Sequence, residues 1–467
     1  VMFGSNKQSD GGGAYSAPVV QGTVVQGEPV AQHVPVPVPM PMPSAPAYDE
    51  TPLTAGPSST DFNGYKGEIQ GQKFNDVPFA IAFVVHLVVM LYFLVAYAVG
   101  GGQGGDGNYY DYTGVAYFVS VCGVFATGLS TVALGFMMKF SNILVKMALF
   151  FSIGLSLGVG IMGLLSGQIL MGVMGLVSFA FGICYAYFVW GRIPFAAANL
   201  NTALSAVKSN MGLAGVAYFF LFVAFGWSIW WSVAAGGAMN GMGSGIVFLF
   251  LVSYYWTHQV IQNTVHVTVA GVIGTWWFVP DEASSCCSPA LKDSFVRATT
   301  YSFGSICFGS LLVAVVQALR TLQHMLREND DFNFLVCIID CILACIESII
   351  EYLNTWAYVY VGLYGYSYLE AGKNVITLFQ NKGWTTLITD DLAQNVLLMM
   401  SVGIGLVSGL VGLVVAAIDK DIFAGIGYDD AGAVGFFVGF LVGFVLASIL
   451  MSVVGSAVNT VIVCFAE

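Results

Sequence analysis

The stretch Ser253–Phe278 reads SYYWTHQVIQNTVHVTVAGVIGTWWF and places polar side chains inside a run that is otherwise apolar enough for a membrane. Aromatic residues bound it at both ends, and Thr, His, Gln and Asn lie between them. Polar groups in hydrocarbon cost free energy unless they find partners or water. Two interpretations are open: these side chains satisfy one another between packed helices, or they line a path or a binding site.

The composition of the whole chain indicates an integral membrane protein. Of its 467 residues, 57% are hydrophobic and 9% are charged, whereas soluble domains carry about 25% charged residues. Apolar runs of about 18 to 25 residues recur from Val77 onward, each long enough to cross a hydrocarbon core of about 30 Å as a helix. The alternating pattern of membrane barrels is absent. We therefore predict an all-α fold with about ten transmembrane helices in a lipid bilayer.

Charge and motifs exclude several function classes. The formal net charge of −12 argues against nucleic acid as a partner. The sequence holds no Gly-x-x-x-x-Gly-Lys-Ser/Thr loop and no His-Glu-x-x-His pattern, which mark nucleotide-binding proteins and zinc proteases. We predict a protein that is not an enzyme and that needs neither a cofactor nor a metal.

The chain divides into two parts. Residues 1–75 are rich in Gly and Pro and include the run PVPVPMPMP at Pro35–Pro43, a composition that cannot build a core. We predict a disordered cytoplasmic tail, whose proline run either docks an SH3-like or WW-like domain or serves as a solvated spacer. Residues 76–467 are predicted to form the polytopic transmembrane domain.

The predicted spans follow the apolar runs of this second part. They are 77–99, 112–138, 144–165, 169–190, 211–235, 246–278, 296–320, a crossing within 332–369, 392–418 and 431–465. Polar connections are expected at 191–210 and 372–391. The run 246–278 exceeds one crossing, which leaves three possibilities: one long tilted helix, a helix broken near Gly271, or two short helices.

Basic residues set the predicted orientation, because Lys and Arg gather on the cytoplasmic side of a membrane. With ten spans, both termini are cytoplasmic, in the plasma membrane or an organellar membrane. Arg320 and Arg327 do not fit this scheme. An alternative topology places Arg320 through Glu351 in the cytoplasm.

Glycines four residues apart predict close packing between helices of one subunit, because they let backbones approach. The pairs and the triplet are Gly154/Gly158, Gly163/Gly167, Gly405/Gly409 and Gly435/Gly439/Gly443.

Aromatic residues gather in and around the opening stretch. Quaternary ammonium ions have no hydrogen to donate and bind best to aromatic faces, so rings at Trp256 and Trp276 favour a choline-like cation. The alternative is an interfacial aromatic belt. For proton coupling the candidates are Glu347, Glu370 and His258. A solvated helix face or a hydrogen-bonded structural histidine explains them equally well.

Three segments resemble the choline transporter-like family (solute carrier family 44), in particular its fungal and protist branch. They are VSYYWTHQVIQNTVHVTVAGVIGTWWF, which contains the opening stretch, GSICFGSLLVAVVQALR at Gly304–Arg320, and EYLNTWAYVYVGLYGYSYLEAGKNVITLF at Glu351–Phe379. The resemblance implies a ten-helix transporter that moves choline, or a related organic cation or amine, by facilitated diffusion or proton-coupled exchange. The short connection at Gly100–Asp111 resembles the fungal-type members.

The resulting prediction is a membrane transporter of choline or a related cation. The alternatives are a channel-like or lipid-handling protein and a non-transporting membrane scaffold. The predicted substrate-binding residues are Trp227, Trp231, Tyr255, Trp256, Gln259, Asn263, His266, Trp276 and Tyr358.

Overall fold

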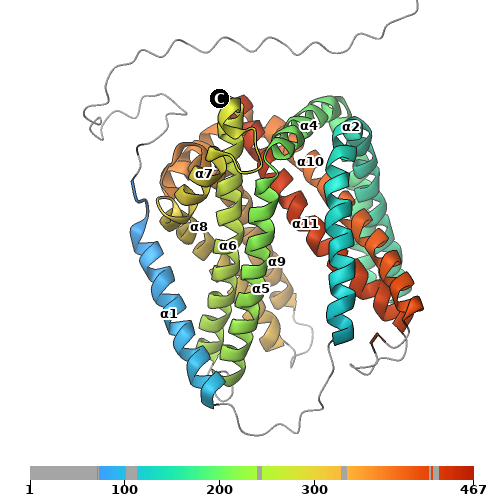
Figure 1. The fold of residues 1–467 in the computed structure, drawn as a ribbon. Helices are drawn as coiled ribbons and strands as arrows, with labels where there is room; N and C mark the ends of the chain where they lie inside the picture. The colour runs from blue at the N-terminus through green and yellow to red at the C-terminus, as the bar shows by residue number, and fades with distance from the viewer. Residues whose placement is uncertain are drawn as a thin grey trace, which may run out of the picture. The chain divides into compact units, whose positions relative to one another are not determined.

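The described part of the chain is built from helices in this computed structural model (Figure 1). The structure describes residues 71, 73–100, 113–238, 244–327, 334–419, 422–423 and 431–466. The α-helices are α1 Val77–Gly100, α2 Thr113–Leu165, α3 Ile169–Val189, α4 Ile193–Ser209, α5 Gly212–Ala238, α6 Ser244–Phe278, α7 Pro289–Thr299, α8 Phe303–Arg327, α9 Phe334–Tyr364, α10 Tyr368–Ile418 and α11 Ala431–Ala466. Because these described residues contain no strand, the predicted all-α fold is confirmed. The predicted tail, residues 1–75, lies outside them apart from residues 71 and 73–75.

Seven helical stretches of the described residues are long and apolar enough to cross a membrane. They are Val77–Ala96, Gly114–Leu165, Ile169–Ser209, Gly212–Ala235, Phe303–Gln323, Thr386–Ile418 and Ala431–Ala466. Two of them, with 52 and 41 residues, are at least twice as long as the roughly 20 residues of one crossing. A multi-span helical membrane protein is therefore confirmed, while the count of ten spans stays a prediction.

Helix α2 contains the two spans predicted at 112–138 and 144–165. Its backbone leaves helical geometry at Phe140 (φ −120°, ψ 19°), between the two predicted spans. The arm after Phe140 packs closely on α3, where a Cβ on Gly163 would lie 2.6 Å from the backbone nitrogen of Gly172. The two arms of α2 thus correspond to the two predicted spans.

Helix α6 runs without a break from Ser244 to Phe278, so the long continuous helix is the correct one of the three possibilities. Its 35 residues extend over about 52 Å, at about 1.5 Å per residue. Gly271 is a packing position rather than a break, because a Cβ there would lie 2.6 Å from Oγ of Ser294 on α7. Helices α5, α7, α8, α9 and α11 all contact α6, which is therefore surrounded by its neighbours (Figure 1).

Two segments predicted as polar connections are helical instead. Residues 191–210 contain α4, an amphipathic helix with a buried face that includes Ala196, Leu200 and Ala203. Residues 372–391 belong to α10, which continues through them into the apolar span. This continuity is the physical reason for the second correction, since a helix once started adds residues at low cost.

The predicted span at 296–320 is wrong at its start. The chain forms α7, turns, and begins α8 only at Phe303. Further on, the crossing predicted within 332–369 corresponds to one continuous helix, α9. Gly365 follows α9 with a φ of 75°, a conformation that glycine adopts without strain. The chain turns there into α10.

The carboxylate of Asp76 joins the starts of three helices. The residue lies directly before α1 and has a φ of 52°, which is uncommon for a side chain other than glycine. Its Oδ2 accepts a hydrogen bond from the Ser305 hydroxyl on α8 (2.6 Å) and one from the backbone N–H of Tyr368 on α10 (2.9 Å). These contacts explain why α8 starts later than predicted, because the turn before it packs against the beginning of α1.

Close glycine contacts join α10 and α11 along a seam. The seam consists of Gly405, Gly409 and Gly412 on α10 and Gly435, Gly439 and Gly443 on α11. A Cβ on Gly439 would lie 2.7 Å from the carbonyl oxygen of Ser408, so only glycine fits there. The packing predicted from these spacings is confirmed. It is wrong for Gly154 and Gly158, where a Cβ would have no neighbour within 4 Å.

Candidate functional site

Four polar residues of α6 share one face of the helix and form its polar stripe: Tyr255, Gln259, Asn263 and His266. Their spacing of four, four and three residues keeps them in line, because an α-helix repeats every 3.6 residues. Helix α6 is not among the seven strongly apolar stretches. Its polar side chains make it less suited to face lipid than to face other helices, and helices α5, α7, α8, α9 and α11 contact it.

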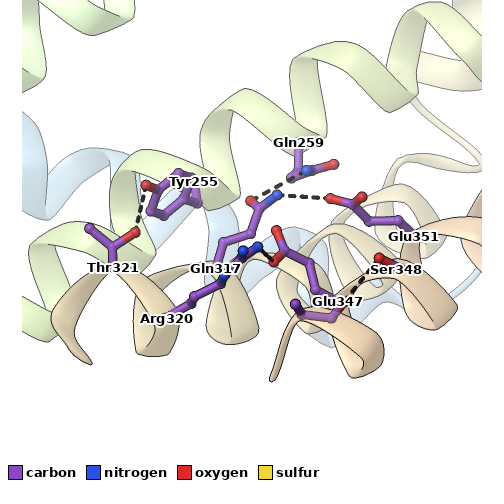
Figure 2. A network of polar contacts seen from close by, with 9 residues as sticks. Tyr255, Gln259, Gln317, Arg320, Thr321, Glu347, Ser348 and Glu351 are labelled. Carbon is purple, nitrogen blue, oxygen red and sulfur yellow. Dashed lines mark hydrogen bonds and ion pairs between the residues drawn. The ribbon is translucent and has the colours of Figure 1, made fainter. Parts of the chain in front are cut away.

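At one end of the stripe, hydrogen bonds connect α6 through α8 to α9, as Figure 2 shows. The Tyr255 hydroxyl lies 2.8 Å from Oγ1 of Thr321. The Gln259 amide donates to Oε1 of Gln317 at 3.4 Å, and Gln317 donates in turn to Oε1 of Glu351 at 2.9 Å. A polar side chain of α6 is thereby connected to a carboxylate two helices away.

A second carboxylate lies one turn before Glu351 on α9. Glu347 accepts a hydrogen bond from Nη1 of Arg320 at 2.7 Å, in an ion pair with side-chain exposures of 14% and 40% respectively. The guanidinium neutralises Glu347 and orders it. Glu351 instead receives a neutral amide donor and has no ion-pair partner among the described residues, which leaves it the freer counter-charge for a cation.

At the middle of the stripe, Asn263 reaches the buried tyrosine of α9. Its amide donates to Oγ of Ser310 at 3.0 Å, and Ser310 lies 3.3 Å from the hydroxyl of Tyr358. Tyr358 is fully buried and also donates to the carbonyl oxygen of Ile306 at 3.1 Å. Gly309 makes room for this tyrosine, because a Cβ at that position would collide with its hydroxyl.

His266 closes the stripe with both ring nitrogens engaged. Its Nε2 lies 2.8 Å from the carbonyl oxygen of Thr355 on α9, and its Nδ1 lies 2.5 Å from Oγ of Ser456 on α11. A carbonyl oxygen only accepts, so Nε2 carries the hydrogen, and a neutral ring accepts at Nδ1. His266 therefore holds α6, α9 and α11 together.

Two of the predicted tryptophans, Trp256 of α6 and Trp227 of α5, lie around His86 of α1. The His86 ring centroid lies 5.2 Å from Trp256, 5.9 Å from Trp227 and 5.5 Å from Phe83. The Trp256 indole donates to the carbonyl oxygen of Cys307 at 2.9 Å, whereas the buried Trp227 indole N–H has no hydrogen-bond partner. This aromatic cluster is packed between α1, α5, α6 and α8.

The remaining predicted tryptophans do not join that cluster. Trp231 donates to the carbonyl oxygen of Phe250 at 2.9 Å and packs against Tyr254 at 4.9 Å. Trp276 packs on the core 20 residues beyond Trp256, which corresponds to about 30 Å along the helix. The structure thus brings together Tyr255, Gln259, Asn263, His266 and Tyr358. Of the predicted tryptophans, two share the cluster around His86, and the other two pack elsewhere.

The three proton-coupling candidates all have local partners. Glu347 is held by Arg320, and His258 lies 3.1 Å from Oγ of Ser228. Glu370 forms a capping box with Ser367 at the start of α10. Burial alone would raise the pKa of the Glu370 carboxyl, but hydrogen bonds from Ser367 and two nearby lysines lower it below its ordinary value. Glu370 is thus tied to the beginning of its helix.

Sequence reasoning missed a carboxylate pair on α10, Asp390 and Asp391. The two residues belong to the segment predicted as a polar connection, but they lie at the beginning of the membrane-spanning stretch Thr386–Ile418. Asp390 is buried, with 6% of its surface exposed, and Asp391 is exposed. The available signal was the position of two adjacent acids directly before a long apolar run.

Comparison with known proteins gives a consistent family match. A protein-family model described as "Plasma-membrane choline transporter" matches residues 173–467. The chain is similar to a CTL-like protein of Dictyostelium discoideum, with 29% identity over 370 residues, 76% of this chain and 66% of the relative. It is also similar to the protein PNS1 of Cryptococcus neoformans, with 29% identity over 352 residues, 66% of this chain and 61% of the relative.

A further relative is the protein PNS1 of Candida albicans, with 30% identity over 388 residues, 74% of this chain and 73% of the relative. The chain spans less than two thirds of the length of the Dictyostelium and Cryptococcus relatives. The family match contains α4 to α11 and with them the whole polar stripe.

Proposed function

The chain belongs to the plasma-membrane choline transporter family, and from this premise we propose that it carries choline or a related organic cation across a membrane. The polar stripe of α6 and its partners on α8 and α9 would contact the cation. Both termini would be cytoplasmic, in the plasma membrane or an organellar membrane. The cation would move by facilitated diffusion or in exchange for a proton.

The observation that supports this proposal is the connection between the stripe and a carboxylate. Gln317 bridges Gln259 on α6 and Glu351 on α9 (Figure 2). A quaternary ammonium cannot donate a hydrogen bond, so it needs a negative charge and aromatic faces. Glu351 supplies the charge, and Tyr255 and Tyr358 supply rings on the same side of α6.

The neighbouring ion pair has a separate part in this proposal. Arg320 keeps Glu347 neutralised, so only one net negative charge remains beside the stripe. A single charge suits a monovalent cation, because binding and release both require a moderate affinity. Arg320 would also repel a second cation while the first is bound.

Uptake of radiolabelled choline into proteoliposomes tests the proposal. We expect saturable uptake by the parent protein and a loss of at least about tenfold, or about 1.4 kcal/mol, in Glu351→Gln. Asn263→Ala is expected to reduce uptake in the same direction. Ser348→Ala is the matched control on α9, since the Ser348 hydroxyl only bonds to the carbonyl oxygen of Ala344 on its own helix.

Three outcomes contradict the proposal. Parent protein without uptake would remove the substrate assignment. Current that does not saturate with choline concentration would favour a channel. Unchanged uptake in Glu351→Gln would remove the stripe from the cation path.

A further inference from the structure

Asp390 is a buried carboxyl within a membrane-spanning stretch, and the proposed transport mechanism has not used it. Its exposed fraction is 6%, and its Oδ1 accepts a hydrogen bond from the amide of Gln394, one turn later on α10, at 3.2 Å. Its other interacting groups are Asp391, which is also negative, and Tyr352 of α9. No Lys or Arg of the described residues pairs with it.

Polar atoms without hydrogen bonds lie on the helices that surround Asp390. Tyr352 interacts with both Asp390 and Trp356, yet the Tyr352 hydroxyl and the Trp356 indole N–H have no well-formed hydrogen bond. Oδ1 of Asn459 on α11 is also without a partner, although Asn459 is 2% exposed. Buried polar groups are normally satisfied, so these three atoms call for an explanation.

Helix register brings Asn459 to the level of Asp390. Helices α10 and α11 are antiparallel along the glycine seam, and the amide of Gln394 packs against Gly455. One turn back on α10 is Asp390, and one turn forward on α11 is Asn459. The unpartnered oxygen of Asn459 therefore lies at the same height in the membrane as the carboxyl.

An ionised carboxylate in such a place is unfavourable, because no positive charge compensates it. Protonation removes the charge and gives Asp390 an O–H donor. This donor matches the Asn459 amide oxygen, which lacks one at this level of the bundle. The pocket thus fits a neutral, protonated Asp390 better than a charged one.

The neighbouring acid, Asp391, lies at an open groove. Asp391 lines an open groove of about 480 Å³ between α2, α3 and α10. Its Oδ2 accepts hydrogen bonds from the Tyr185 hydroxyl at 2.6 Å and from the Asn395 amide at 3.2 Å. The adjacent acids therefore differ in access: Asp391 faces the groove and Asp390 faces the interior.

The pocket is connected to the polar stripe through His266. The two partners of His266 are Thr355 and Ser456. Thr355 precedes Trp356 in the chain, and Ser456 follows Gly455, against which Gln394 packs. The two partners of His266 are therefore the immediate chain neighbours of residues that surround Asp390.

We propose that Asp390 is a reversible proton-binding site whose protonation state is communicated to the α6 stripe. The carboxylate takes a proton from a hydronium ion in the groove, an O–H bond forms, and water remains. In the reverse step the carboxyl returns the proton to water. The titratable groups that interact with Asp390 are Asp391 on its own helix and Tyr352 on α9. His266 of α6 lies behind them, and Asn459 of α11 does not titrate.

Infrared difference spectroscopy of the purified protein during a pH titration tests the site without any transport. We expect a protonated-carboxyl C=O band in the parent that disappears in Asp390→Asn. Asp281→Asn, which changes an exposed acid of the turn after α6, is expected to retain that band. A band that persists in Asp390→Asn overturns the proposal.

A second experiment tests the connection to transport, and this readout rests on the proposed function. Uptake into proteoliposomes is compared with and without an imposed pH gradient. We expect a gradient effect of several-fold in the parent and none in Asp390→Asn, while exchange of labelled for unlabelled choline continues. Asp390→Glu is expected to keep the gradient effect.

The two experiments separate the two claims. If the parent protein does not transport choline but the infrared band depends on Asp390, the substrate assignment fails and the proton site stands. If Asp390→Asn transports choline with the parent's gradient dependence, the coupling is overturned while the transporter assignment stands.

Discussion

The Nδ1 atom of His266 on α6 lies 2.5 Å from Oγ of Ser456 on α11, although 190 residues separate the two in the chain. This contact joins the two polar regions of the protein. On one side of it lies the polar stripe of α6, which is connected through Gln317 to Glu351. On the other side lie the residues around Asp390. The histidine has its second nitrogen on the carbonyl oxygen of Thr355, so its ring orientation is fixed.

Replacement of His266 is expected to destabilise the protein more than replacement of its partner. His266→Leu leaves the Thr355 carbonyl and the Ser456 hydroxyl without their ring contact, at a cost of about 1–3 kcal/mol for unsatisfied groups. Ser456→Ala removes the hydroxyl that contacts His266 and also lies 3.0 Å from the Ser452 carbonyl oxygen on its own helix, and we expect a loss of about 1 kcal/mol. Thermal unfolding in detergent measures both. Non-additive losses in the double variant are expected as well, and an equal or larger loss in Ser456→Ala would contradict the assignment.

The tryptophans beside His86 offer a matched pair of substitutions. Trp256→Phe loses the hydrogen bond from the indole to the Cys307 carbonyl, whereas Trp227→Phe loses none, because that indole N–H has no partner. Both changes remove the same volume. We therefore expect Trp256→Phe to be less stable than Trp227→Phe by about 1 kcal/mol, as a difference between their unfolding midpoints. The reverse order would show that packing rather than the hydrogen bond dominates.

The glycine seam predicts opposite effects for two alanine substitutions. Gly439→Ala introduces a Cβ only 2.7 Å from the Ser408 carbonyl oxygen, and overpacking of this kind costs about 1–3 kcal/mol. Gly154→Ala introduces a Cβ with no neighbour within 4 Å. It is expected to be neutral or to stabilise by up to about 1 kcal/mol, because alanine is the better helix former. Comparable destabilisation by both changes would exclude the seam as the cause.

The capping box at the start of α10 predicts a pH-dependent contribution to stability. The pKa of Glu370 is lowered in the folded protein, because hydrogen bonds from Ser367 and the charges of Lys73 and Lys373 outweigh the effect of burial. A lowered carboxyl pKa contributes stability that is present above the ordinary value of 4.5 and is lost as the pH falls below it.

Glu370→Gln keeps the geometry of the box but removes the charge. We expect the variant to be less stable than the parent near pH 7, by less than about 1 kcal/mol because the charges are screened by water. The difference should vanish at acidic pH, where the parent carboxyl is protonated too. Melting curves at a series of pH values measure this. A difference that does not change with pH would show that the ionised carboxylate is not involved.

The fold and part of the site could be predicted from the sequence. Apolar runs predict the helices, and the polar residues of Ser253–Phe278 predict a polar face, since Tyr255, Gln259 and Asn263 do align on α6. Their partners could not be predicted. Gln317 and Ser310 are two of several polar residues on α8, and helical periodicity alone does not say which neighbouring helix they meet.

The missed carboxylates have a different explanation. Residues 372–391 contain enough polar side chains to be interpreted as a connection, but the capping box at Ser367 starts a helix that continues through them. Asp390 therefore lies inside a packed bundle rather than at a loop. Only the register between α10 and α11 reveals that it faces buried groups without partners.

The glycine seam has a mechanical consequence. Backbones that meet without intervening side chains have no soft layer between them, and packed interfaces of this kind shift between discrete arrangements rather than deforming gradually. Helices α10 and α11 are therefore expected to move together as one rigid body, which carries both Asp390 and Ser456. Any rotation of α10 and α11 against α6 would change the contact between His266 and Ser456.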